Sequence, residues 1–281
     1  MNGRVLIVAG SDSGGGAGIQ ADIKTVTALG GYAMTAITAL TAQNTRGVFG
    51  VFPVDLGFIR QQIELVATDI GADVVKTGML ATAEVIDTVA DALAEYAPGV
   101  PVVIDPVMVA KGGAPLLAAD AASTLARRLL PLAAVVTPNA PEAAALAGFE
   151  VRTIDDMKRA GEKLCRAGAA AALVKGGHIE GAGVTDVLVT PQGIELFEGP
   201  RLPGTSTHGT GCTLASAIAT GLAQKLPLRD AVARARAYVV EAIRTAPGLG
   251  HGHGPLNHAH TVRPFDAPSL SPRGRGRDPS R

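Results

Sequence analysis

The chain has 281 residues, of which 47% are hydrophobic and 18% are charged, and its formal net charge is zero. Such a chain buries a large core, and its neutral charge balance argues against nucleic acid or an anionic membrane as the main partner. No apolar run is long enough to span a membrane, and the first residues lead into a strand rather than a signal-peptide core, so we expect a cytoplasmic protein. The two cysteines, Cys165 and Cys212, do not suggest a disulfide framework.

The N-terminal segment predicts a strand, a glycine-rich loop and a helix. Residues 5–9 form an apolar strand, residues 10–18 (GSDSGGGAG) form the loop, and residues 17–29 form the helix. The loop matches neither of the common glycine-rich nucleotide motifs, since no Lys-Ser/Thr pair or downstream acid has the required spacing. Its position at the carboxyl end of a strand nevertheless favours ligand binding. A second strand, residues 34–40, leads into a polar loop at residues 41–45.

The rest of the chain continues this alternation of strands and helices. The expected strands are residues 73–76, 101–104, 133–136 and 170–174, the expected helices are residues 58–70, 85–94, 156–166 and 228–243, and residues 184–190 and 193–197 form an edge hairpin. Alternation of this kind predicts an α/β fold with a central, mostly parallel sheet and helices on both faces. No internal repeat or break in composition divides the body, so we expect a single domain at residues 1–262.

Three of the predicted strands end in polar residues that suit a phosphate or metal site. Asp105 follows the strand at 101–104, and Lys175 follows the strand at 170–174 and precedes two glycines. Glu142 lies in the first turn of the helix after the strand at 133–136. An Asp-Pro turn explains Asp105 equally well, and a helix-dipole interaction explains Glu142 without a metal.

Residues 203–221 (PGTSTHGTGCTLASAIATG) predict an anion-binding loop that runs into a helix. Gly209 and Gly211 allow backbone N–H groups to converge on one ligand, and the helix beginning near residues 210–212 offers its positive end to a phosphate. Cys212 stands in the first turn, where the helix dipole is expected to lower a thiol pKa. The alternative is an ordinary helix start capped by Ser206 or Thr207.

The C-terminal region combines closely spaced histidines with a polar tail. His251, His253, His258 and His260 invite a metal interpretation, but a glycine-rich loop packed on the body fits their spacing better. Residues 263–281 are poor in apolar residues and rich in Arg, Pro and Ser, which predicts a disordered tail. An RNA-binding role for the RGRGR segment has little support. Cys165 shares a helical face with apolar residues and is interpreted as a core residue.

Seven segments in order resemble one family. They are AGSDSGGGAGIQADIK (9–24), TAQNT (41–45), KTGML (76–80), DPVMVAKGG (105–113), TPNAPEA (137–143), LVKGGH (173–178) and STHGTGCTLASAIA (206–219). Together they resemble hydroxymethylpyrimidine/phosphomethylpyrimidine kinase, the thiamine-pathway branch of the ribokinase-like kinases, over about residues 4–260. The resemblance implies one ribokinase-like domain, usually a homodimer, that uses MgATP to make first the pyrimidine monophosphate and then the diphosphate.

The resemblance also implies roles for individual residues. It assigns the aminopyrimidine to Gln43, whose amide can both donate and accept a hydrogen bond. The other implied roles are the pyrimidine pocket wall for Gly10, Ala17, Met79 and Val107, Mg²⁺ for Asp105 and Glu142, the ATP phosphates for Asn139 and Lys175, and the anion hole for Gly209, Thr210 and Gly211. Cys212 stands where the sugar kinases typically use an Asp as the base.

Two other functions remain open. A pyridoxal kinase of the same fold is the first, because it also phosphorylates a hydroxymethyl group. A non-catalytic pyrimidine or nucleotide sensor is the second, and the complete set of Asp105, Glu142, Lys175 and Cys212 argues against it, because a pure binder needs neither a base nor metal carboxylates.

Overall fold

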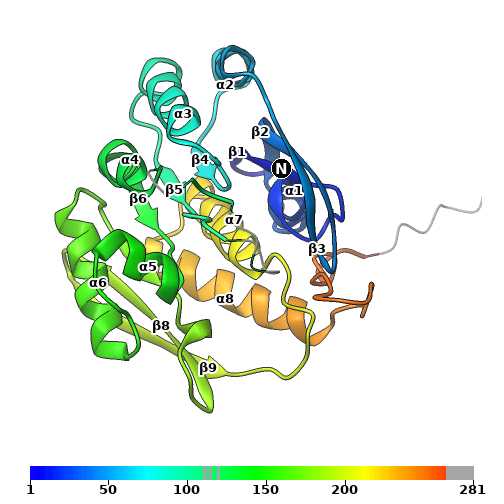
Figure 1. Ribbon diagram of the computed structural model, residues 1–281, viewed down its shortest axis with the longest axis vertical. Coiled ribbons are helices and arrows are strands. Elements are labelled where there is room, and N and C mark those ends of the chain that lie inside the picture. The colour runs from blue at the N-terminus through cyan, green and yellow to red at the C-terminus, as the bar shows by residue number, and fades with distance from the viewer. Residues whose placement is uncertain (110–112, 114–115, 119–120, 264–281) are drawn as a thin grey trace, which may run out of the picture.

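The computed structural model describes residues 1–109, 113, 116–118 and 121–263. In these residues the strands form one nine-stranded sheet in the order β3-β2-β1-β4-β5-β6-β7-β8-β9 (Figure 1). The strands are β1 (Arg4–Asp12), β2 (Tyr32–Asn44), β3 (Gly47–Pro53), β4 (Val74–Thr77), β5 (Val102–Ile104), β6 (Ala133–Val136), β7 (Ala172–Val174), β8 (Gly183–Thr190) and β9 (Gly193–Pro200). The helices are α1 (Gly18–Ala28), α2 (Leu56–Asp69), α3 (Ala83–Tyr96), α4 (Ala121–Arg128), α5 (Ala140–Ala147), α6 (Ile154–Arg166), α7 (Thr210–Ala223) and α8 (Leu228–Arg244).

The central strands are parallel, as the alternating pattern predicts. Pairing runs parallel from β2 through β1, β4, β5 and β6 to β7. The edge strands are antiparallel: β3 pairs with β2 at one edge, and the β8–β9 hairpin closes the other. Parallel strands covered on both faces need continuous apolar sequence, and residues 5–8 of β1, VLIV, are fully buried.

Two layers of helices cover the sheet (Figure 1). On one face, α2, α3 and α4 pack their apolar side chains against the central strands, and Ile59, Ile63 and Ile86 are fully buried there. On the other face, α1, α7 and α8 bury a second core that is rich in alanine, with Ile218 fully buried. α5 and α6 close the end of the sheet near β7 and β8. The small residues of α7 let this helix lie close to the strands, which fixes its N-terminus at the sheet edge.

Three elements differ from the prediction. Within the polar segment 41–45, expected as a loop, residues 41–44 form the end of β2, which pairs with the unpredicted strand β3. β3 is exposed on both of its sides, so its sequence carries no alternation of apolar and polar residues. The short helix α4 was also not predicted.

The C-terminal loop packs on the body, as expected. His253 donates its backbone N–H to the carbonyl oxygen of Thr45 at 2.8 Å, and the N–H groups of His251 and Gly252 lie 3.2 Å from the Thr45 hydroxyl. Cys165 is partly buried, packs against the core and lies 3.8 Å from the Val189 carbonyl oxygen. Residues 264–281 of the predicted tail and residues 110–112 of the DPVMVAKGG segment lie outside the described residues. Within the part of the chain that the structure describes, no helix is long and apolar enough to cross a membrane.

Candidate active site

The predicted site residues gather at the carboxyl edge of the parallel strands. Asp105 follows β5, Asn139 follows β6, and Lys175 follows β7. Asn139 and Lys175 also form an isolated parallel bridge beyond the ends of their strands. The register of the sheet therefore places side chains from distant parts of the sequence beside one another.

A buried cluster of two carboxylates and one lysine lies at this edge. Lys175 Nζ is 3.0 Å from Asp105 Oδ1 and 3.9 Å from Glu142 Oε2. Burial acts to lower the pKa of Lys175, but the two carboxylates outweigh it and the pKa is raised. Asp105 Oδ2 is buried and has no hydrogen-bond partner among the described residues. A buried carboxylate oxygen without a partner is costly in a folded protein, so this atom is a candidate contact for a cation or a hydrogen-bond donor.

Glu142 lies in the first turn of α5 and caps it. Its side chain completes a capping box, accepting the Asn139 backbone N–H at 2.7 Å, while Asn139 Oδ1 accepts the Glu142 N–H at 2.9 Å. The same carboxylate faces Lys175 and Asp105. Burial raises the pKa of Glu142 to about 7, Lys175 acts to lower it, and Asp105 acts to raise it. The cap thus holds a carboxyl group that titrates near neutral pH beside the lysine.

The N-terminus of α7 is open for an anion. Its cap residue is Gly209, with φ of 81° and no side-chain capping bond, so capping by Ser206 or Thr207 is wrong. A Cβ atom on Gly209 would lie 1.8 Å from the Gly16 carbonyl oxygen, which shows how closely the two glycine-rich loops pack. A Cβ atom on Gly211 would lie 3.1 Å from Lys175 Nζ. The first turn of α7 therefore lies directly against the lysine and carboxylate cluster.

Cys212 lies in this first turn, but its thiol does not have the expected low pKa. Burial raises the pKa of Cys212 to about 12. The Lys76 ammonium group and the Gly18 backbone N–H act to lower it, and the carboxylates of Asp22 and Asp105 act to raise it. The prediction of a lowered pKa is wrong for the substrate-free protein, because burial of the thiolate outweighs the helix dipole.

A fully buried ion pair, which sequence reasoning missed, lies one helical turn below the site. Lys76 Nζ is 3.0 Å from both carboxylate oxygens of Asp22, and neither side chain is exposed. Ser216 donates its hydroxyl to Asp22 Oδ1 at 2.7 Å. Asp22 and Ser216 follow Gly18 and Cys212 by four residues on α1 and α7. The signal was present in the sequence, because Asp22 falls on the apolar face of its helix.

The residues assigned to the pyrimidine pocket come from neighbouring strand ends. A Cβ atom on Gly10 would lie 3.1 Å from Met79 Sδ, so these two residues are in contact. Ala17 precedes α1 and donates its N–H to Asp12 Oδ2 at 2.8 Å. Val107 donates its N–H to the Asp105 carbonyl oxygen at 2.8 Å, which places it beside the acidic cluster. The Gln43 amide lies 3.2 Å from His208 Nε2, and His208 directly precedes Gly209.

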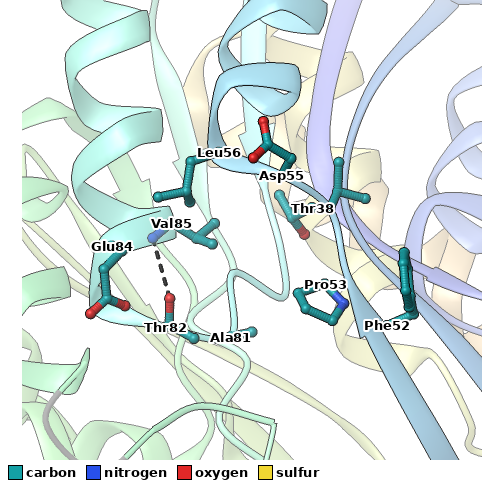
Figure 2. Close-up of a pocket in the computed structure, with 10 residues that line it drawn as sticks. Thr38, Phe52, Pro53, Asp55, Leu56, Ala81, Thr82, Glu84 and Val85 are labelled. Carbon is teal, nitrogen blue, oxygen red and sulfur yellow. Dashed lines mark hydrogen bonds between the residues drawn. The ribbon is translucent and has the colours of Figure 1, made fainter.

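A separate cavity of about 540 Å³ lies between β3 and the starts of α2 and α3 (Figure 2). Its lining includes Phe52, Leu56, Thr82 and Val85, and no residue assigned to the site from sequence. Thr38 connects this cavity to the site, because its hydroxyl donates to the Met79 carbonyl oxygen at 2.7 Å. This cavity is therefore separate from the cluster of Asp105, Glu142 and Lys175, none of which lines it.

The comparisons identify one family over most of the chain. The family model described as phosphomethylpyrimidine kinase matches residues 12–257. The hydroxymethylpyrimidine/phosphomethylpyrimidine kinase of Bacillus subtilis is 46% identical over 256 residues, which is 91% of this chain and 94% of that protein. The thiamine biosynthesis bifunctional protein ThiED of Geobacter sulfurreducens is 55% identical over 91% of this chain, but the chain spans only 52% of that relative.

The fold is also similar to that of solved vitamin-kinase structures. The crystal structure of an ADP complex of Bacillus subtilis pyridoxal kinase superposes with a TM-score of 0.85 at 38% identity, covering 92% of this chain and 98% of that one. The ribokinase-like α/β fold expected from the sequence is confirmed, and so is the resemblance drawn from the seven segments. The chain belongs to the phosphomethylpyrimidine kinase family.

Proposed function

We propose that the protein transfers the γ-phosphoryl group of ATP to the alcohol of hydroxymethylpyrimidine and then transfers a second one to the resulting phosphate, as a step of thiamine biosynthesis. The observation that carries this proposal is the meeting of the two glycine-rich loops beside Lys175 and Asp105. The uncapped start of α7 faces this cluster, and the combination suits a phosphate chain. The names of the relatives agree, and the enzyme is expected to work in the cytoplasm.

The anion hole and Lys175 bind the phosphates in this proposal. The backbone N–H groups of Gly209, Thr210 and Gly211 are the proposed donors at the start of α7, where the Thr210 N–H makes only a long contact, 3.4 Å, to the Thr207 carbonyl oxygen. Lys175 keeps its charge because two carboxylates face it, and it lies beside Gly211. The capping box uses the Asn139 side-chain oxygen, so the amide NH₂ group of Asn139 is the part left to contact ATP. Fixed donors of this kind stabilise the charge of phosphoryl transfer without reorganising.

The residues present fit Mg²⁺. Among the described residues, no group of three or more His, Cys, Asp or Glu side chains is placed to hold a metal. A pair of carboxylates still suits Mg²⁺, which keeps several waters and completes its shell with substrate phosphates. Asp105, with its unpartnered Oδ2, and Glu142 would hold the ion. When bound, Mg²⁺ neutralises charge on the phosphates.

The pyrimidine binds against Gln43 in this proposal, between the walls formed by Gly10, Ala17, Met79 and Val107. The lack of a side chain at Gly10 lets Met79 pack against its backbone, because a Cβ atom there would lie 3.1 Å from Met79 Sδ. Cys212 is proposed to contact the attacking oxygen. With a pKa of about 12, the thiol is protonated at neutral pH, so Cys212 can accept a proton only in the small fraction of molecules that carry a thiolate.

We also propose a homodimer, through the edge of the sheet formed by β2 and β3. Two large apolar side chains of β3 are exposed there, Phe49 at 73% and Phe52 at 69%, and Phe58 on α2 is 56% accessible. Large exposed apolar side chains that lie together mark interaction sites. Phe49→Asp with Phe52→Asp should give a monomer by light scattering after gel filtration. Leu196→Asp on β9, at the opposite edge of the sheet, should not change the mass.

The test of the proposed function is a coupled assay of ADP release with hydroxymethylpyrimidine, its phosphate, pyridoxal and ribose. We expect turnover with both pyrimidines at higher kcat/KM than with pyridoxal, and none with ribose. Pyridoxal is the second candidate substrate, because the solved structure of a pyridoxal kinase is so similar. A preference for pyridoxal would replace the first proposal with the second. Preference for ribose, or ATP binding without turnover of any substrate, would contradict both.

A further inference from the structure

One ring nitrogen of His208 lies within hydrogen-bond distance of two side chains. His208 Nε2 lies 2.8 Å from Asp12 Oδ2 and 3.2 Å from the Gln43 side-chain amide. His208 is 8% exposed and Asp12 is 2% exposed, so neither contact is dominated by water. Since one ring nitrogen carries at most one proton, the two contacts are not independent.

The proton on this nitrogen is decided by Asp12. The carboxylate of Asp12 accepts the backbone N–H groups of Gly14, Gly16 and Ala17 at 2.8, 3.1 and 2.8 Å. Burial acts to raise the pKa of Asp12, but the hydrogen bonds from His208 and from the backbone outweigh it and the pKa is lowered. Asp12 is therefore ionised, and a ring nitrogen 2.8 Å from an ionised oxygen must donate. The proton is on His208 Nε2.

This assignment fixes the amide of Gln43. As placed, its nitrogen faces His208 Nε2 and its oxygen lies 3.1 Å from the Thr41 hydroxyl. Two donors would then meet at His208. The Thr41 hydroxyl has one proton, which it donates to the Ser11 carbonyl oxygen at 2.8 Å, so it can only accept from Gln43. The clash is removed when the amide oxygen faces His208 and the amide NH₂ faces Thr41, because the His208 N–H, donated mainly to Asp12 at 2.8 Å, is then shared with an acceptor at 3.2 Å.

The backbone of Gln43 is held as firmly as its amide. Ser13 Oγ lies 2.9 Å from the Gln43 backbone nitrogen, whose N–H it accepts, and 3.0 Å from the Gln43 carbonyl oxygen, to which it can donate. Ser13 belongs to the same loop whose N–H groups surround Asp12. This loop thus fixes the backbone of Gln43 directly and acts on its amide only through Asp12 and His208.

In this orientation each end of the amide has one partner and one free position. An amide oxygen accepts two hydrogen bonds and an amide NH₂ donates two. After His208 and Thr41 have taken one each, one lone pair and one N–H remain. An aminopyrimidine offers the complementary pair: its exocyclic amine donates and its ring nitrogen accepts.

We propose that Asp12, His208 and Thr41 are positioning residues that lock the Gln43 amide in one orientation, so that the site selects amino-substituted pyrimidines over oxo-substituted ones. This inference rests on the proposed binding of the pyrimidine to Gln43. An amide that could rotate freely would offer its donor and acceptor in either order and would accept both rings. Because buried polar groups left unpaired are costly, the locked amide rejects the ring with the wrong order.

The test compares hydroxymethylpyrimidine with its oxo analogue, in which a carbonyl replaces the amine and the adjacent ring nitrogen carries a hydrogen. ADP release gives kcat/KM for each, and their ratio is the discrimination factor. We expect wild type to prefer the amino compound by at least about 10-fold, the size of one lost buried hydrogen bond. Thr41→Val, which removes the acceptor that fixes the amide NH₂, should reduce this factor most of the way to one. Thr41→Ser, which keeps the hydroxyl, should retain it.

Three results would overturn the inference separately from its premise. If wild type does not discriminate, the amide is not locked. If Thr41→Val lowers kcat/KM for both compounds equally, Thr41 is merely structural. If Gln43→Ala keeps the discrimination, a group other than Gln43 recognises the ring. If wild type does not turn over the amino compound at all, the proposed function itself is wrong. His208→Phe gives a second variant, in which the factor should also fall while the KM for ATP changes less.

Discussion

The buried pair of Lys76 and Asp22 allows a quantitative prediction of stability. Lys76→Met removes the ammonium group and leaves a carboxylate with no exposed surface and only Ser216 as a side-chain partner among the described residues. At the observed 3.0 Å, two unit charges attract by about 5 kcal/mol at an effective dielectric constant near 20. Breaking a buried pair from one side typically costs 3–5 kcal/mol, so we expect Lys76→Met to lose about that much unfolding free energy.

Urea unfolding at pH 7 measures this loss, and a second variant tests its cause. Lys76→Met with Asp22→Asn has no buried charge, keeps a partner for Ser216, and should recover most of the stability. Lys158→Met, which breaks the surface pair with Asp155, should cost less than about 1 kcal/mol. A loss below about 1 kcal/mol in Lys76→Met, or an equal loss in the double variant, would refute the reasoning.

The pH dependence of this variant has a definite sign. Burial raises the pKa of Asp22, and Lys76 acts to lower it, so the carboxyl in Lys76→Met should have a still higher pKa. A group whose pKa is raised on folding contributes stability below its unfolded pKa, and this contribution is lost as the pH rises through the folded value. The difference between Lys76→Met and wild type should therefore be smaller at pH 5 than at pH 7.

Three further predictions concern the site. Gln43→Ala should weaken pyrimidine binding by about 1–3 kcal/mol and leave nucleotide affinity unchanged, as measured by calorimetry, and equal loss for both ligands would contradict its role. Gly209→Ala should reduce kcat/KM for both transfers at least 10-fold, because its Cβ would lie 1.8 Å from a backbone oxygen of the other loop. Gly204→Ala is the control, because Gly204 also has a positive φ but a Cβ atom there would have no atom within 4 Å. If both variants lost the same activity, backbone strain and not the contact with Gly16 would explain the loss. Alkylation of Cys212 by iodoacetamide in a Cys165→Ala background should keep accelerating up to pH 10, because its pKa is about 12, and a plateau near pH 8 would refute that value.

The sequence predicts the parts of the site that depend on strand ends. Asp105, Asn139 and Lys175 follow short apolar strands, and in a parallel sheet those ends lie at one edge. The start of α7 was predicted for a similar reason, because two glycines and an apolar repeat mark the turn and the helix. These features are local in sequence, and the topology only has to bring them together.

The missed features depend on partners far apart in the chain. Lys76 and Asp22 are 54 residues apart, and His208 and Asp12 are 196 apart. The place of Asp22 on the apolar face of its helix is a hint of burial, but the sequence does not show its partner, and only the packing of α1, α7 and β4 brings the pair together. The prediction of a lowered pKa for Cys212 was wrong for the same reason. The sequence shows that Cys212 lies at a helix N-terminus, but it does not show the burial that outweighs the helix dipole.

The pKa of Cys212 also sets how much the thiol can contribute to each transfer. Burial raises the pKa of the thiol to about 12, so at pH 7 it is almost entirely protonated. The scarcity of the thiolate therefore offsets the 10²–10⁴-fold acceleration that a general base typically contributes. The second transfer needs no base, since a phosphate monoester is largely ionised at that pH. The first transfer does not require the substrate alcohol to lose its proton before the new bond begins to form, because phosphoryl transfer has a loose transition state.

We therefore expect Cys212→Ala to slow the first transfer by less than about 10²-fold and the second by less still. Single-turnover rates with hydroxymethylpyrimidine and with its phosphate, measured on the same variant, separate the two steps. A loss of 10²–10⁴ confined to the first transfer would show that bound substrates make the thiolate available, against the substrate-free electrostatics. Equal losses in both would assign Cys212 to the shape of the anion hole, since a wall of that hole serves both transfers alike.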